Sequence, residues 1–513
     1  MIGKKLLCLS LAVLMLCGVL AGCGGGKEPA GPAGTSTGSV ESSKATDGKT
    51  SEQTADPGSS LPSYNRAAQD LDRYELDVLH VEPDLWNMHT DLAPVNYTGD
   101  VISNAIYSRN EYVEEQYNCF ITEHNGITFY SMSGQIATLV LSGECMYDAA
   151  YSEGSSVNEL VSQSLVENLY SFSALQLDES WWSQIVNRES TLGTGKYRTL
   201  FFTQSNLSLP AFDLTWCVYF NKAMHYSYQL DDLYEMAREK TWTIGQLYST
   251  AKSIATMNGD ETFTYSADGK AIYGMTTYWN GAKAMLIGGG IRFTGRNEDD
   301  DLVVAKFGED YTNLCDALAL LFGESGTFTF GGPSSDGSTT GNASDYTKIF
   351  NANRSLFLGA EVKASVSALK DFPYEFGILP MPAMNEGDEY RSWVNYLAPV
   401  LVLPKQTEDP EKATILLDAL SYYSDRDVLP IYYDKVLRGR GAKDEDSVDM
   451  LEIINQTRCF DASIAYGWSR QFVEVVAKLV FQGNGPAAGV QPESYTEMIQ
   501  TNIENTFNAV FGD

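Results

Sequence analysis

The sequence predicts an α/β protein built from two lobes. In the first part of the chain, strand-like runs at Tyr74–Val81, Cys119–Glu123 and Tyr147–Tyr151 alternate with helical patterns, which is typical of parallel βαβ units. From Gly195 to Gly259, two strand-like runs are joined by a polar crossing that contains a proline and are followed by a capped helix. This order suits a chain that passes from one α/β lobe into another. A length of 513 residues is sufficient for two ordinary domains.

The N-terminus has the features of an export signal. Lys4 and Lys5 precede an apolar run, Leu6–Leu20, that is too short for a membrane span of about 20 residues. The run ends in Leu20–Cys23, which resembles a bacterial lipobox. We expect residues 1–22 to be a lipoprotein signal peptide and Cys23 to carry the lipid. The alternative is an ordinary secretory signal with incidental cysteines.

The composition of the chain indicates a flexible linker and argues against anionic binding partners. Residues 23–66 are mainly small and polar and cannot bury enough apolar surface to offset their ordering entropy, so we expect a flexible linker. The chain has 67 acidic and 35 basic residues, for a net charge of −32. Phosphate backbones and anionic headgroups would be repelled. We therefore expect no nucleic-acid partner, and membrane contact through the Cys23 lipid only.

The cysteines and histidines indicate neither a metal site nor a catalytic one. After the signal and Cys23, five widely spaced cysteines remain, with no CxxC pair, so we expect small buried apolar residues rather than a disulfide framework. The four histidines lack metal-ligand spacing, and no GxSxG elbow occurs. We expect no cofactor, no metal and no enzymatic activity. Carboxylates abound, so a pair of acids of the glycosidase type remains an alternative.

The first three strands place candidate ligand-binding residues. Asp100 is expected to cap a helix between the first two strands. Trp86 lies in a polar loop after the first strand, and Glu153 and Ser155 lie in the turn after the third. Ligands of open α/β sheets sit beyond the carboxyl ends of the strands, so these three residues are candidates for ligand binding.

In the middle of the chain, a helix start carries the clearest local signal. Thr243 and Gln246 have the spacing of a capping box, and Trp242 and Leu247 have that of a hydrophobic staple. Trp242 is therefore expected to be buried rather than to serve as a ligand platform. The paired Trp181-Trp182 is likewise expected to pack within a lobe.

A second group of candidates follows. Trp279 comes after the strand expected at Tyr273–Thr277 and just before a helix, which is a credible position for a ligand platform. Asp213 lies near a predicted strand end. Gly288–Gly290 is expected to end a helix, since no phosphate-loop Lys-Ser/Thr follows it.

Five segments, in order, resemble the bacterial family 1 extracellular solute-binding proteins: Val218–Lys222, Lys240–Thr243, Phe350–Leu358, Tyr374–Pro382 and Asp409–Ala413. They resemble the family's "YNK" strand end, "TW-x-E-L" helix start, return strand, "YGV-x-P-x-P" segment and "NPE-x-A" helix.

The match has three departures from the family's usual residues. Phe220 replaces a Tyr, Gln246 replaces a Glu and Asn353 replaces a Gly.

The resemblance implies a periplasmic-binding-protein-like fold of class II, with two lobes joined by a hinge. We expect one lobe at about 70–208 and 354–402, and the other at about 209–353 and 403–513. It also implies that a C-terminal loop offers aromatic rings to the ligand, for which Tyr466 and Trp468 are the matching candidates.

The implied function is that of a lipid-anchored, extracytoplasmic monomer that captures a solute for the permease of an ABC importer. An uncharged oligosaccharide is the expected solute, since Trp and Tyr rings suit the C–H faces of sugars. A cell-surface glycoside hydrolase and a carbohydrate-binding lipoprotein without a transport role are the alternatives.

Overall fold

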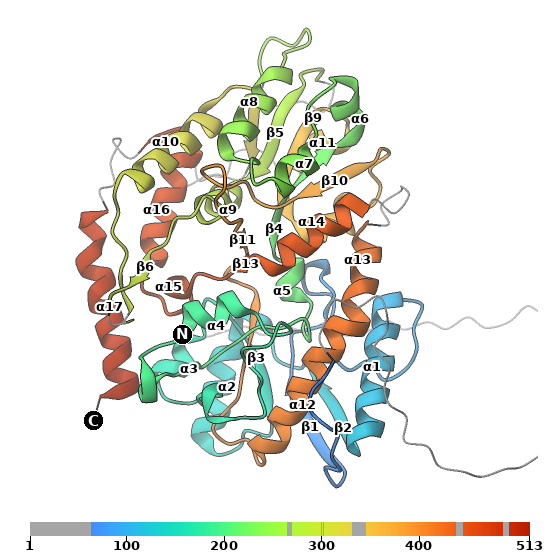
Figure 1. The fold of residues 1–513 in the computed structure, drawn as a ribbon, viewed down its shortest axis with the longest axis vertical. Coiled ribbons are helices and arrows are strands. Elements are labelled where there is room, and N and C mark those ends of the chain that lie inside the picture. Colours follow the sequence, from blue (N-terminus) through green and yellow to red (C-terminus); the bar gives the residue numbers. More distant parts are fainter. Residues whose placement is uncertain are drawn as a thin grey trace, which may run out of the picture. The chain divides into compact units, whose positions relative to one another are not determined.

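The structure, a computed structural model, describes residues 63–512 except 264–268, 299, 301, 331–344, 438–444 and 486–491 (Figure 1). The expected signal peptide, Cys23 and most of the expected linker lie outside the described residues. None of the helices within the described part of the chain is both long and apolar enough to cross a membrane.

A four-stranded sheet forms the first lobe, in the order β12-β3-β1-β2. Its strands are β1 (Tyr74–Leu79), β2 (Cys119–His124), β3 (Ala149–Glu153) and β12 (Pro399–Val402). β1 pairs in parallel with β2 and β3, as the alternating pattern predicted, while β12 is antiparallel to β3. Asp100 caps the intervening helix α1 (Val101–Tyr117) by accepting bonds from the first-turn amides.

A five-stranded sheet forms the second lobe, in the order β10-β4-β9-β5-β8. Its strands are β4 (Trp216–Asn221), β5 (Tyr273–Tyr278), β8 (Thr327–Phe330), β9 (Ser355–Glu361) and β10 (Phe376–Leu379). Every residue of β4 and β9 is buried, as expected for central strands covered on both faces. Two small two-stranded pairs complete the strands: β6 (Thr294–Arg296) with β7 (Leu302–Val304), and β11 (Ser392–Trp393) with β13 (Arg458–Cys459).

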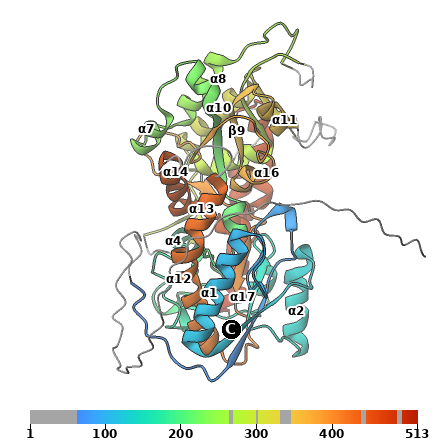
Figure 2. The ribbon, with the colours of Figure 1, turned by 90° about the vertical axis from the view of Figure 1, so that its right-hand side faces the viewer.

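Helices cover both sheets (Figures 1 and 2). In the first half of the chain they are α2 (Met132–Ser142), α3 (Asn158–Ser162), α4 (Gln184–Ser190), α5 (Pro210–Asp213), α6 (Lys222–Ser227), α7 (Leu233–Arg238) and α8 (Ile244–Ile254). In the second half they are α9 (Asn280–Gly288), α10 (Glu309–Gly323), α11 (Asp345–Asn351), α12 (Pro410–Tyr423), α13 (Leu429–Leu437), α14 (Glu445–Gln456), α15 (Ala462–Ala465), α16 (Arg470–Phe481) and α17 (Glu493–Phe511).

Strand pairing corrects the expected lobe boundaries. The range 354–402 was assigned to the first lobe, yet β9 and β10 both pair with β4 in the second sheet, and only β12 joins the first. The range 403–513 was assigned to the second lobe, yet α12 packs into the core of the first with Trp181 and Trp182. The chain therefore returns to the first lobe between β11 and β12, later than expected.

Local signals at helix starts are largely confirmed. Thr243 accepts a bond from the Gln246 amide at 3.2 Å, and Trp242 and Leu247 are fully buried. The second hydrogen bond of a capping box, between the Gln246 side chain and the Thr243 amide, does not form, because the Gln246 side chain donates to Thr250 instead. Four of the five remaining cysteines are buried, and all five are unpaired.

One expected strand is wrong. Residues 197–203 form only single bridges, Leu192 with Thr199 and Thr203 with Leu401. Leu200, Phe201 and Phe202 are buried without a continuous ladder, whereas Tyr197 is 60% exposed.

Candidate functional site

The carboxyl ends of three strands carry the most promising set of polar and aromatic side chains. Glu153 is the last residue of β3, Tyr278 the last of β5 and Glu361 the last of β9. Ligands of open α/β sheets bind beyond such ends. The segment Asn395–Pro399 connects the two lobes here, because Asn395 donates to Glu361 at 3.4 Å while Pro399 pairs with Glu153.

Tyr278 and Glu361 meet because β5 and β9 run in parallel side by side. The Tyr278 hydroxyl donates to Glu361 Oε1 at 2.9 Å. Burial and the Glu361 carboxylate hold the pKa of Tyr278 well above its usual range, so its hydroxyl remains a donor. Asn280 Nδ2 donates to the same hydroxyl at 3.4 Å, and its buried Oδ1 has no partner among the described residues. This amide oxygen is therefore available to a donor on a ligand.

Trp279 lies beside a buried cation. Lys283, one helical turn later on α9, places Nζ 3.7 Å from the centroid of the Trp279 ring. The same Nζ donates to the Tyr396 hydroxyl at 3.3 Å and forms an ion pair with Glu474. Burial lowers the pKa of Lys283 to about 8, although Glu474 opposes this shift.

The arrangement combines flat rings with hydrogen-bonding groups. The side chains of Trp279 and Tyr396 are half-buried, which leaves part of each exposed. Tyr396 Oη also lies 3.4 Å from Glu474 Oε1. Such a set suits a neutral ligand with apolar faces and a rim of hydroxyl groups.

Trp86, in the first lobe, contacts the segment that follows the end of β9 in the second. It lies in the short 3-10 helix η1 (Leu85–Asn87) with φ of 50° and ψ of 30°, a left-handed conformation. Its ring packs edge to face on Phe129, with centroids 5.4 Å apart. Lys363, in the 3-10 helix η5 (Val362–Ser365) that follows β9, lies 5.6 Å from its centroid. This contact joins the two lobes.

Glu153 and Ser155 lie together at the end of β3, where Glu153 is the last strand residue rather than part of the predicted turn. The Ser155 hydroxyl donates to the carboxylate of Glu153, which is 6% exposed. Gly154 between them approaches the connecting segment so closely that a Cβ would lie 2.9 Å from the Ala398 carbonyl oxygen. The turn is thus held directly against Asn395–Pro399.

Asp213 is placed differently from the expectation. It is fully buried in α5 and accepts bonds from the backbone and ring of His89 and, at 2.8 Å, from the Tyr432 hydroxyl. His89 belongs to the first lobe, and Tyr432 lies on α13. In this structure Asp213 therefore ties together the segments that cross between the lobes, and no face of it is open to a ligand.

Tyr466 and Trp468 are also covered, although they lie in a turn as expected. Each is 1% exposed, and their rings stack with centroids 4.8 Å apart. The Tyr466 hydroxyl donates to the Ser190 carbonyl, and Trp468 Nε1 donates to Thr506 on α17 at 2.8 Å. Both rings therefore belong to the core, Trp468 against α17 and Tyr466 against α4.

Sequence reasoning missed Lys283, Glu361, Tyr396 and Glu474. Two of them could have been found from the sequence: Glu361 ends an apolar run, and Lys283 lies four residues after Trp279, on the same face of a helix. Tyr396 and Glu474 carried no local signal, since each reaches the site only through tertiary packing.

No protein-family model matches the sequence, and no curated protein matches it. Solved structures do match. UspC of M. tuberculosis has a TM-score of 0.52 at 14% identity, over 84% of this chain and all of that chain. A cyclo/maltodextrin-binding protein complexed with maltotetraose has a TM-score of 0.52 at 11% identity, over 84% of this chain and 97% of the other.

A third match is the galacto-N-biose-/lacto-N-biose I-binding protein of an ABC transporter from Bifidobacterium longum, in complex with lacto-N-biose. Its TM-score is 0.51 at 13% identity, over 86% of this chain and 98% of the other. At these identities the shared feature is the two-lobed α/β fold, and it extends over nearly the full length of each matched chain.

Proposed function

We propose that this chain, whose two-lobed fold is that of the family 1 extracellular solute-binding proteins, captures an oligosaccharide and delivers it to an ABC importer. The observation that carries the proposal is the group formed by Trp279, Tyr396, Lys283 and Glu474, where half-exposed rings lie beside hydrogen-bonding groups. A sugar presents apolar C–H faces for such rings and hydroxyl groups for their polar neighbours.

The ligands of the matched structures support a saccharide. Two of them hold maltotetraose and lacto-N-biose. On the first lobe, Glu153 pairs with Pro399, three residues after Tyr396, and Trp86 lies beside Lys363, two residues after Glu361, so we expect a ligand at the group to touch both lobes. A ligand that contacts both lobes binds the closed state preferentially, which is how capture would be coupled to a hinge motion.

Calorimetry with a panel of neutral oligosaccharides, free sugars and peptides tests the proposal, using the full chain purified in detergent. Trp279→Ala should weaken saccharide binding by about 1–3 kcal/mol, the scale of a lost aromatic contact. Tyr226→Ala is the matched control, since Tyr226 is 86% exposed and lies on α6. Binding of peptides alone, or unchanged binding by Trp279→Ala, contradicts the proposal.

Chromatography of the recovered saccharide separates capture from catalysis. An intact saccharide supports a binding protein, whereas shortened products identify a glycoside hydrolase. Small-angle scattering gives an independent readout, because saturating ligand should reduce the radius of gyration. An unchanged radius with a bound ligand contradicts a hinged capture protein.

Anchoring is a separate part of the proposal. Leu20–Cys23 supports cleavage before Cys23 and attachment of a diacylglycerol to its sulfur, which would hold the protein at the extracytoplasmic face of the membrane. Cys23→Ala should leave the protein unprocessed or shed it, and should abolish metabolic labelling with palmitate. Persistent labelling of this variant excludes Cys23 as the anchor.

A further inference from the structure

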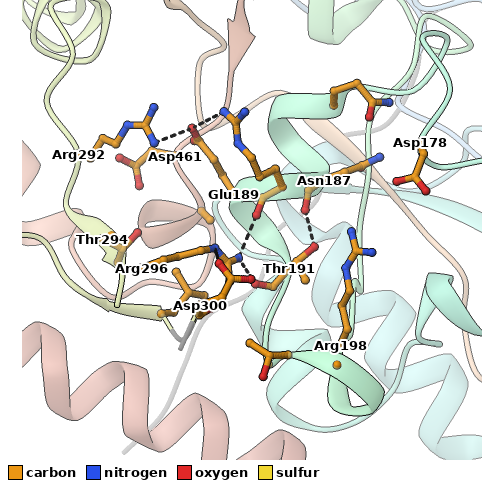
Figure 3. A pocket seen from close by; sticks show the side chains of 18 of the residues that line it. Asp178, Asn187, Glu189, Thr191, Arg198, Arg292, Thr294, Arg296, Asp300 and Asp461 are labelled. Atoms are coloured by element: carbon orange, nitrogen blue, oxygen red, sulfur yellow. Dashed lines mark hydrogen bonds and ion pairs between the residues drawn. The ribbon is translucent and has the colours of Figure 1, made fainter. Parts of the chain in front are cut away.

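A cavity that shares no lining residue with the candidate saccharide site gathers positive charge. It has a volume of about 530 Å³ and lies between α4 and the β6–β7 hairpin (Figure 3). Five arginines line it: Arg188, Arg198, Arg292, Arg296 and Arg391. The chain as a whole has nearly twice as many acidic as basic residues, so this concentration of guanidinium groups runs against its overall charge.

Three of these arginines share one carboxylate. Arg391 donates to Glu189 Oε1 through both terminal nitrogens, at 3.2 and 3.1 Å, while Arg188 and Arg292 each approach the same oxygen at 3.8 Å. The Glu189 side chain is 15% exposed. One carboxylate thus faces three cations, and burial together with the charge of Arg391 lowers the pKa of Arg292.

Donors remain unused around this carboxylate. The Arg391 side chain is 10% exposed, and its buried Nε has no hydrogen-bond partner among the described residues. Half of the Arg292 side chain is exposed. Arg296, by contrast, is already engaged, because it donates to the carbonyl oxygens of Arg188 and Thr191.

Three other carboxylates line the cavity, those of Asp178, Asp300 and Asp461, and Asp300 lies 3.6 Å from Arg296. Asp461 caps α15 by accepting a bond from the Ser463 amide at 2.9 Å. Burial raises the pKa of Asp461 to about 6, an effect to which neighbouring Glu189 adds. Asp461 is therefore mostly ionised at pH 7, but the five guanidinium groups still outnumber the four carboxylates that line the cavity.

We propose that this cavity is a binding site for a phosphate or sulfate group, held by Arg188, Arg292 and Arg391. Guanidinium groups bind tetrahedral oxyanions through paired, charge-assisted hydrogen bonds. A dianion would offset the excess charge and accept bonds from the unused donors. The cavity also has room for a small molecule that carries the group as an ester. Because Arg188 lies on α4 and Arg292 lies between α9 and β6, the anion would bridge the two lobes.

The test measures thermal unfolding of the full chain in detergent, with inorganic phosphate, sulfate or glucose 6-phosphate added at constant ionic strength. Sodium chloride at the same ionic strength is the reference. We expect the oxyanions to raise Tm above the chloride value in a saturable manner, since a ligand that binds the folded state stabilises it. A stronger response to glucose 6-phosphate than to phosphate identifies an ester as the ligand, and equal responses identify the free anion.

Two substitutions at the cavity should act in opposite directions. Arg292→Gln removes a half-exposed cation and should weaken phosphate binding roughly tenfold, whereas Glu189→Gln removes the competing anion and should strengthen it by a similar factor. Arg73→Gln removes an exposed charge outside the cavity and should leave the affinity unchanged.

Two results overturn the proposal. One is a wild-type Tm that responds to phosphate and sulfate no more than to chloride. The other is a phosphate response that Arg292→Gln and Glu189→Gln leave at the wild-type value. Neither result bears on saccharide capture, which the calorimetric panel tests separately.

Discussion

The carboxylate of Asp418 should be a principal stabilising group of the first lobe. It lies fully buried on α12 and accepts five hydrogen bonds. The donors are the Gln176 amide and side chain, both at 2.9 Å, the indole N–H groups of Trp181 and Trp182 at 3.1 and 2.8 Å, and the Tyr64 hydroxyl at 2.9 Å. A buried carboxylate with this many donors is well compensated for its lost hydration.

Asp418→Asn replaces one acceptor oxygen by a donor of nearly the same size. Oδ1 could still serve the Gln176 amide and both indoles, but the new NH2 group would face the donors that now bind Oδ2, from Tyr64 and the Gln176 side chain. Each hydrogen bond to a charged group contributes about 1.5–3 kcal/mol, so losing two predicts a destabilisation of about 3–6 kcal/mol.

Urea unfolding of the full chain, followed by tryptophan fluorescence, measures this loss, since Trp181 and Trp182 lie at the site of the change. Asp409→Asn is the control on the same helix. Asp409 is the N-cap of α12, and Asn caps helices about as well as Asp, so this variant should lose less than about 0.5 kcal/mol. A loss below about 1 kcal/mol for Asp418→Asn would refute the reasoning.

Three further predictions concern the pH dependence of stability and the packing. Burial raises the pKa of Asp425 to about 7 in the folded protein, so the folded state keeps a proton that the unfolded state releases above about pH 4. The free energy of unfolding should therefore fall as pH rises from 4 to 7, by up to about 4 kcal/mol more than in the Asp425→Asn variant. Urea midpoints that change in parallel for the two proteins across this range would contradict the prediction. Trp468→Ala removes a buried indole and should lower the free energy of unfolding by about 3–5 kcal/mol. A variant as stable in urea as the wild-type protein would show that Trp468 does not lie in the core. Gly274→Ala puts a Cβ 2.2 Å from the Ala251 carbonyl oxygen and should destabilise by about 1–3 kcal/mol in thermal unfolding, while Gly295→Ala, with nothing within 4 Å, should have little effect.

Local chemistry made part of the structure readable from the sequence. Helix caps depend on residues two or three positions apart. Those expected at Asp100 and Thr243 form, and so does one at Asp409. The strands β1, β2 and β3 were predicted from apolar runs that are separated by helical patterns, and all three pair in one sheet. The turn after β3 followed from the same pattern, although the strand extends two residues further than predicted, to Glu153.

Residue type indicated correctly that some aromatic rings would be buried, but it did not identify all of them. Trp181, Trp182 and Trp242 were expected in the core and are there. Tyr466 and Trp468 were expected at an exposed loop, and the turn itself forms, but whether a turn is exposed depends on what packs over it. Here Trp468 contacts α17, which begins about 25 residues further along the chain, and Tyr466 contacts α4, far earlier in the chain.

The sequence by itself determined the α/β class, most helix starts, the alternation of strands and helices in the first lobe, and the resemblance to solute-binding proteins. Only the tertiary structure decided which sheet each later strand joins, because β9 and β12 are both short apolar runs, and their different partners lie more than 80 residues away. The same holds for the candidate sites. Lys283 finds Tyr396 and Glu474, and Glu189 finds Arg292 and Arg391, across 100 to 200 residues of chain, since such contacts arise from folding and leave no periodic or local trace.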